Sequence, residues 1–352
     1  MIKFIYKRLS YGFLVILGVA IVVFFIFHAL PGDPVAMMAG QRTDVSTRDA
    51  ITAELGLDKP LPHQLGMYLN DLSPISIHKD TPENEESYGY FKMVHVGEKV
   101  LVLKYPFLRR SFQTNKKVSE ILFEHFEGTF WLTVTAMIFA TVVGIFMGIS
   151  AALNQNKFID HFLVTTSVLG VSIPSFVASI FAAILFADIL ADYTGLDITG
   201  QLWTNDAIEG RHLELKNLIL PAFTLGIRPL AIVVQLTRSS MLEVMSQDYI
   251  RTARAKGLSN FSVIYKHALK NALNPVITAV TGWLASLLAG AFFVEMVFNW
   301  KGLGLVTITA VYNLDFPVVM GATLLVAVIF VLINMMVDIL YAAVDPRVRL
   351  SE

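Results

Sequence analysis

Six long stretches with almost no charged side chains constrain this 352-residue chain more than any other feature. A bilayer core about 30 Å thick needs about 20 apolar helical residues to cross it, whereas a helix on a soluble core normally keeps a charged face. Arg228 is the one Asp, Glu, Lys or Arg residue within the six. The sequence therefore predicts an all-α polytopic membrane protein with six transmembrane helices. These are expected at residues 12–30, 129–153, 162–187, 218–237, 274–294 and 316–337.

The overall composition supports this prediction and excludes several other classes. The chain is 55% hydrophobic and 16% charged, against about 25% charged in ordinary soluble domains. A net charge of −1 gives no electrostatic case for binding nucleic acid. Because cysteine is absent, disulfides, thiolate metal sites and iron–sulfur clusters are excluded.

The first apolar stretch follows Lys3, Lys7 and Arg8, as in a secretory signal. It is, however, longer than the ~7–15 apolar residues of a signal core, and no clear cleavage site follows it. We therefore interpret residues 1–30 as an N-terminal segment with a retained first helix.

The distribution of Lys and Arg predicts the orientation, because cytoplasmic loops are enriched in them. With a cytoplasmic N-terminus, the inner segments contain 12 basic residues in 70 positions and the outer ones 14 in 149. Both termini are therefore expected in the cytoplasm, including the tail at 345–352.

Residues 31–128 differ in composition, with 25 charged residues in 98 positions. This density predicts an external α+β insertion between the first two membrane helices. A short helix is expected at 48–55, closed by Gly56. Residues 73–87 are expected to form an extended or mobile connection. A hairpin is expected at 90–105, turning at 97–98, and a helix at 116–126.

The sequence contains no recognisable catalytic set. It has no G-x-x-x-x-G-K-[ST] phosphate loop, no H-E-x-x-H pair, and no two histidines spaced as metal ligands on one helix face. The chain is therefore expected to be no enzyme and to bind no cofactor or metal of its own.

The loop at 238–273, between the fourth and fifth stretches, is the most informative segment. Asp248 is expected to cap a short helix over 249–256, and Gly257 suits the left-handed position that ends it. Tyr249, Ala253 and Gly257 then form one stripe whose small positions let another backbone come close. Arg251 and Arg254 flank this stripe. Two interpretations remain open at this point: a solvated basic loop, or a helix that docks onto a soluble partner.

The chain also resembles a known family. The segment RTARAKGL at 251–258 is similar to the "EAA" coupling segment of ABC-importer permeases of the dipeptide/oligopeptide permease family. Further similar motifs follow the family's order: LPGDP at 30–34, LGLDKP at 55–60, QTNKKVSEIL at 113–122, SIPSF at 172–176, RSSMLEV at 238–244 and DPRVR at 345–349.

The resemblance implies a type I ABC importer permease fold in the bacterial inner membrane, with a permease core over 129–344. It implies a second, homologous permease, two ATPase subunits that bind ATP and Mg, and an extracytoplasmic solute-binding protein. Alternating access coupled to ATP hydrolysis is the implied mechanism. Di- and oligopeptides are the favoured substrates, and nickel, glutathione or opine-like solutes are the alternatives. The residues implied to dock onto the ATPase are Asp248, Tyr249, Ile250, Arg251, Ala253, Arg254, Ala255, Gly257 and Leu258.

The sequence departs from the family pattern in three places. Lys270 stands where the general pattern has proline, the stretch at 300–304 reads WKGLG without the usual Pro-Gly, and residues 73–107 lengthen the external segment. The longer segment either contacts the binding protein or is a lineage-specific addition.

Arg228 lies about 10 residues into the fourth stretch and hence near mid-bilayer. An arginine there costs at least ~2.5–3.5 kcal/mol unless it faces a pore or a partner. We expect it to face the translocation pathway or the second permease. An internal ion pair, with Glu295 or Asp188, or an arginine that donates to backbone carbonyls is the alternative. An ion-coupled secondary transporter remains a distant alternative for the whole chain, since no acidic residue lies in the six stretches.

Overall fold

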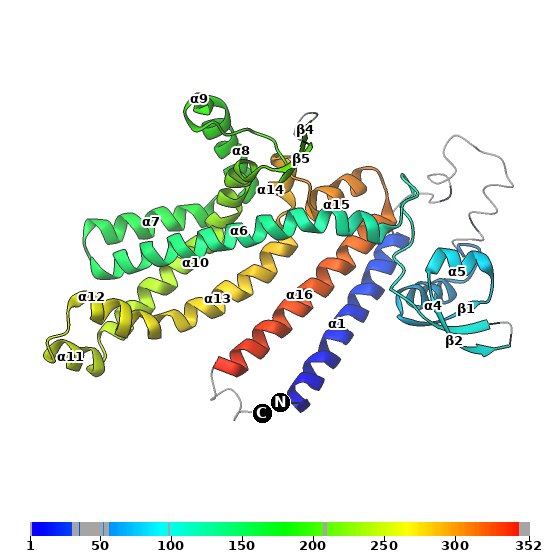
Figure 1. Cartoon of the computed structure of the whole chain (residues 1–352), viewed down its shortest axis with the longest axis horizontal. Helices are drawn as coiled ribbons and strands as arrows, with labels where there is room; N and C mark the ends of the chain where they lie inside the picture. The colour runs from blue at the N-terminus through cyan, green and yellow to red at the C-terminus, as the bar shows by residue number, and fades with distance from the viewer. Residues whose placement is uncertain are drawn as a thin grey trace. The chain divides into compact units, whose positions relative to one another are not determined.

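The computed structural model describes residues 2–29, 35, 52, 56–97, 99–206 and 210–344, and these are predominantly helical (Figure 1). Contacts divide the chain into two compact units, one of residues 1–125 and 306–328 and the other of residues 126–305 and 329–352. The motifs expected at 30–34 and 345–349, and nearly all of the helix expected at 48–55, lie outside the described residues.

Four described helices are long and apolar enough to cross a membrane. Their apolar parts are Tyr6–His28 of α1 (Ile2–Ala29), Val118–Leu153 of α6, Leu215–Met245 around α10 (Ile219–Met245), and Phe316–Asp338 of α16 (Phe316–Val344). A helix pair, Phe158–Ser172 (α7) with Ser175–Ile189, makes a fifth span if counted as one. The described chain thus contains four to five such spans, where the sequence predicted six.

The expected third span is not one straight helix. α7 and the following helices, α8 (Ser175–Ile184) and the π-helix η1 (Leu185–Ile189), meet at an angle of 108°. Pro174 lies at the break, and Ile173 before it is extended, as expected where a proline excludes the helical conformation of the preceding residue. Pro229 and Pro275, by contrast, lie inside continuous helices.

The region of the expected fifth span contains α13 (Leu269–Gly290) followed by the short α14 (Phe292–Val297). A π-helix, η3 (Val263–Ala268), precedes α13. The remaining helices of this second unit are short: α9 (Ala191–Thr194), η2 (Leu215–Leu218), α11 (Asp248–Ala255) and α12 (Asn260–Ser262). A two-stranded ribbon pairs β4 (Trp203–Asp206) with β5 (Gly210–Leu213). α15 (Leu303–Tyr312) belongs to both units.

The first unit contains the predicted hairpin, as β2 (Phe91–Val96) and β3 (Lys99–Leu103). The hairpin forms part of a three-stranded antiparallel sheet, because β1 (Ile75–Lys79) pairs with the other side of β3. α4 (Leu61–Leu72) precedes this sheet.

The prediction of an extended or mobile connection at 73–87 is wrong, because this segment forms β1 and α5 (Pro82–Tyr88). α5 begins and ends with standard helix signals. The Thr81 hydroxyl accepts a hydrogen bond from the Asn84 amide at 3.3 Å, and Pro82 occupies the first turn. Gly89 ends the helix in the left-handed conformation. The polar composition concealed these signals.

Candidate functional site

α11 has the Schellman geometry that the glycine of the coupling segment predicts. Gly257 adopts φ +77°, and its amide donates to the Arg254 carbonyl at 2.9 Å. The Leu258 amide donates to the Ala253 carbonyl at 3.4 Å. These two bonds satisfy carbonyls at the end of α11. A side chain at position 257 would meet no atom within 4 Å, so its backbone conformation, and not crowding within the chain, favours glycine there.

The N-terminus of α11 differs from the prediction, because Gln247 and not Asp248 is the N-cap residue. Asp248 is the first helical residue. Its carboxylate lies 3.4 Å from the Arg251 guanidinium, and both side chains are largely exposed. The helix dipole favours a negative charge in this first turn. Further along, the Ser259 hydroxyl accepts from the Ser262 amide at 3.3 Å and caps α12.

One side of α11 is buried within the chain itself. Ile250 and Ala253 are almost inaccessible and belong to an apolar cluster. The other buried members of this cluster come from the ends of α6, α10 and α13 and from η3: Ile149, Ala152, Met241, Val263, Ala268 and Ala272. Figure 1 shows α11 and α12 at the same end of α10 and α13. The predicted stripe of Tyr249, Ala253 and Gly257 is therefore not one exposed surface.

The remaining predicted docking residues lie on the exposed side of α11 or in the turn after it. These are Asp248, Tyr249, Arg251, Arg254, Ala255, Gly257 and Leu258. Tyr249 is half exposed, and its hydroxyl accepts a 2.8 Å hydrogen bond from Asn271 of α13. The helix thus presents a mainly polar and basic surface, held from behind by an apolar contact.

A buried ion pair joins other helices close to this end of the unit. Asp160 of α7 accepts two hydrogen bonds from Arg238 of α10, at 2.6 and 2.7 Å, and a third from the Asn156 amide at 2.9 Å. Only about 1% of the Asp160 side chain is exposed. Charge-assisted, two-point contacts of this kind are strong and directional. The sequence motif at 238–244 gave no sign of which acidic residue would meet Arg238.

Arg228 lies within α10, next to Pro229, and its side chain is exposed. No carboxylate in the described part of the chain forms an ion pair with it. Glu295, considered above as its partner, is engaged elsewhere. The expected alternative of an internal pair with Glu295 is therefore wrong.

Glu295 of α14 organises a second polar centre that the sequence did not reveal. It is fully buried, and its carboxylate accepts hydrogen bonds from the Thr129 hydroxyl at 2.6 Å and the Leu305 amide at 3.0 Å. Burial raises the pKa of this carboxyl. A side chain on Gly302 or Gly304 would lie within 3 Å of the carboxylate. The WKGLG stretch at 300–304 therefore needs its glycines so that the backbone can approach Glu295.

Within the described residues, no group of three or more His, Asp or Glu side chains is arranged to hold a metal ion.

These features match known membrane permeases. Residues 125–350 match the family described as "Binding-protein-dependent transport system inner membrane component", and residues 1–133 match the N-terminal membrane component of the same systems. The dipeptide transport system permease protein DppB of Escherichia coli K12 is 38% identical over 367 residues, covering 99% of both chains.

Two further relatives cover the same extent. The di/tripeptide transport system permease protein DppB of Pseudomonas aeruginosa is 36% identical over 366 residues, and the glutathione transport system permease protein GsiC of Shigella flexneri is 34% identical over 349 residues. Each alignment covers 99% of both chains. A solved structure of the MetNI methionine ABC transporter superposes with a TM-score of 0.51 at 19% identity, over 64% of this chain and 97% of the other. This last similarity indicates a shared fold alone.

The protein is thus a multi-pass inner-membrane permease component of an ABC importer and is not itself catalytic. The chain belongs to the binding-protein-dependent transport system inner membrane component family, and its full-length relatives include the DppB dipeptide permeases. As a component of such a system, it has ATPase and solute-binding partners.

Proposed function

We propose that this chain is one of two homologous permease subunits that import di- and oligopeptides by alternating access, driven by two ATPase subunits. The observation that carries the proposal is the construction of α11. Its apolar side contacts the ends of three long helices, and its basic side is free to meet a soluble partner. A force applied to α11 would therefore be transmitted directly to the membrane helices.

The proposal includes six membrane crossings with both termini in the cytoplasm. Five are the spans described above, with the bent α7–α8 pair counted as one. α13 supplies the sixth, since its 22 residues extend about 33 Å at 1.5 Å per residue. The density of Lys and Arg, higher in the inner segments, supports this orientation.

Arg228 is proposed to line the translocation pathway or to contact the second permease. It shares one face of α10 with Gln235 and Ser239, seven and eleven residues further on, and all three are exposed. α13 packs against α10, and it exposes Asn274 and Thr278 one helical turn apart. Exposed polar stripes on membrane helices are costly against lipid, which supports a water-filled or subunit-facing environment for both.

Peptides are the proposed substrate class, because the DppB relatives bear dipeptide or di/tripeptide names. Glutathione is the nearest alternative, through the relative named for it, and nickel and opine-like solutes are further ones. Reconstitution of the complete complex with its binding protein in liposomes tests this directly. ATP-dependent uptake of a labelled dipeptide, competed by unlabelled peptides and not by nickel, is the expected result. Uptake that follows an ion gradient without ATP would contradict the mechanism.

Gly257→Asp tests the proposed docking. Aspartate adds a side chain and a negative charge to the exposed turn, so we expect at least a tenfold loss of ATP-driven uptake with normal membrane insertion. Gly257→Asn is the matched control for backbone strain, because asparagine tolerates the left-handed conformation. If the aspartate variant transports as well as the wild type, Gly257 has no docking role.

A further inference from the structure

One face of the sheet in the first unit is apolar and yet exposed. Two cross-strand rows of apolar side chains lie on its outward face. In one row Ile75 and Phe91 flank Leu103, and in the other Ile77 and Val94 flank Leu101. The exposed fraction is 57% for Ile75, 51% for Ile77 and 73% for Phe91.

The opposite face is buried and mixed in character, because Val102 and Val100 of β3 are fully buried there, paired with Ser76 and His78 of β1. Ser76 and His78 of β1 are buried and hydrogen-bonded to each other at 3.0 Å, and the His78 ring lies against the rings of Tyr88 and Tyr90. A sheet on a water-soluble domain normally turns its apolar face inward and its polar face to solvent. A contiguous exposed apolar face instead marks a surface that meets another apolar phase.

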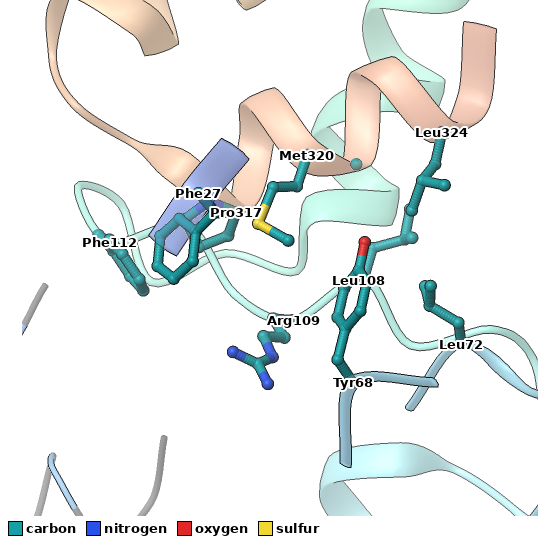
Figure 2. Close-up of a pocket in the computed structure, with 10 residues that line it drawn as sticks. Phe27, Tyr68, Leu72, Leu108, Arg109, Phe112, Pro317, Met320 and Leu324 are labelled. Carbon is teal, nitrogen blue, oxygen red and sulfur yellow. The ribbon is translucent and has the colours of Figure 1, made fainter. Parts of the chain in front are cut away.

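The depth of this sheet follows from α4, which is seated on membrane helices of the same unit. Tyr68 of α4 packs in one cluster with Ala20 and Phe24 of α1 and with Leu324 of α16. Figure 2 shows Tyr68 and Leu72 of α4 facing Leu108 and Leu324. The cavity left between these elements measures only about 20 Å³.

These contacts fall within the apolar spans. Ala20 is eight residues before His28, where the apolar part of α1 ends, and Leu324 is eight residues after the start of α16. Eight helical residues extend about 12 Å, most of one half of a ~30 Å hydrocarbon core. α4 therefore lies beside the leaflet in which α1 ends and α16 begins.

The sheet is fixed to α4 and so lies beside the same leaflet. The Asn70 side chain of α4 donates to the Ile77 carbonyl at 3.2 Å and accepts from the Ile77 amide at 3.0 Å. The Lys104 amide after β3 donates to the Pro74 carbonyl at 2.9 Å. These bonds tie β1 to the helix before it and to the chain after β3.

We propose that the outward face of this sheet rests on the lipid of that leaflet, at the boundary between headgroups and acyl chains. The inference rests on the membrane arrangement in the proposed function. Lys79 and Lys99 are directly paired in the register, on the same face as the apolar rows. Like charges directly opposite are unfavourable alone, and anionic lipid phosphates beside the apolar rows would neutralise them. β1 and β2 are the outer strands of the sheet, and their edges, which no further described strand covers, restrict it to this interface, because the hydrocarbon core tolerates no open edge.

The chain contains no cysteine, so an introduced cysteine is the only one in this subunit. Phe91→Cys and Ile77→Cys carry a spin label on the outward face. Glu86→Cys, on the exposed part of α5, is the matched control. The complete complex is placed in nanodiscs of phosphatidylethanolamine and phosphatidylglycerol, and relaxation by oxygen and by a water-soluble nickel chelate is measured. We expect labels at 77 and 91 to be accessible to oxygen and at least threefold less accessible to the chelate than the label at 86.

Two outcomes would overturn the proposal. Chelate access at 77 and 91 equal to that at 86 would mean that the face meets water. Exclusion of both reagents, or a large change on adding the binding protein, would mean that a protein covers it. ATP-driven uptake is measured on the same variants: normal uptake with a chelate-accessible label rejects the lipid contact alone, whereas lipid protection without peptide uptake by the wild type rejects the proposed function alone.

Discussion

α11 and the three-stranded sheet expose side chains of opposite character. α11 buries Ile250 and Ala253 and exposes its charged residues. β1 buries Ser76 and His78 and exposes Ile75 and Ile77. Both are short amphipathic elements in a membrane protein, so amphipathicity alone does not tell which side faces the core. In the proposals made here, the outward side instead reflects the environment: an aqueous partner for α11, and lipid for the sheet.

The largest expected effect comes from introducing a charge on the buried side of α11. Ile250→Asp places an unpaired carboxylate in the apolar cluster, at a cost of about 4 kcal/mol, and we expect ATP-driven uptake below a tenth of wild type. Thr252→Asp, two residues away on the exposed side, is the control and should leave folding intact. Thermal unfolding and limited proteolysis of the purified complex measure the difference. Equal stability of the two variants would mean that α11 does not pack as described.

The ion pair near α11 should contribute more to stability than the ion pair in the unit that contains the sheet. Asp160→Asn breaks a two-point contact to Arg238 and should destabilise by about 2–3 kcal/mol. Asp71→Asn should cost only about 1 kcal/mol, because Arg109 lies 3.5 Å from Asp71 and burial already raises the pKa of this carboxyl. Denaturation of each variant, with Arg238→Gln to complete a double-mutant cycle, measures the two contributions. The reverse order would contradict the difference in geometry.

The buried histidine of the sheet should make its stability depend on pH. Burial, with the Lys104 cation nearby, lowers the pKa of His78 to about 4, so the unfolded segment binds a proton that the folded one does not. The stability is complete above the unfolded pKa of about 6.5 and falls by about 3 kcal/mol as the pH drops to 4. Hydrogen exchange of residues 75–103 measures this loss. His78→Gln should remove most of the slope, whereas His95→Gln, at an exposed position, should retain it.

The smallest expected effect is from the same substitution on the outward face of the sheet. Ile77→Asp in detergent should change the free energy of unfolding by no more than about 0.5 kcal/mol, because the side chain is exposed. Because Ile77→Asp and Ile250→Asp exchange the same residue types, the difference between their effects on stability measures the contribution of burial. A loss of several kcal/mol in detergent would show that the sheet packs its apolar face within the protein.

The sequence predicted local backbone conformations better than it predicted tertiary contacts. Gly257, Ser259 and the 97–98 turn specify backbone conformations within a few residues, and the family motifs specify the class of protein. The burial of Ala253 was not predicted. A small residue on α11 can face either a partner or the chain itself, and only the packing against α6 and α10 decides between the two. The strand β1 was missed for the opposite reason: its buried residues are Ser76 and His78, which a search for apolar cores passes over. Pairs such as Asp160 with Arg238, 78 residues apart, leave no mark in local sequence.

The apolar contact behind α11 also has a mechanical consequence. Met241 in that contact belongs to α10, whose 27 residues form a rod about 40 Å long. A rod pushed near one end acts as a lever: a tilt of about 5° displaces its far end by about 3.5 Å, on the scale of a side chain. A sub-ångström adjustment at Ile250 can thus be amplified at the opposite membrane surface without bending any helix.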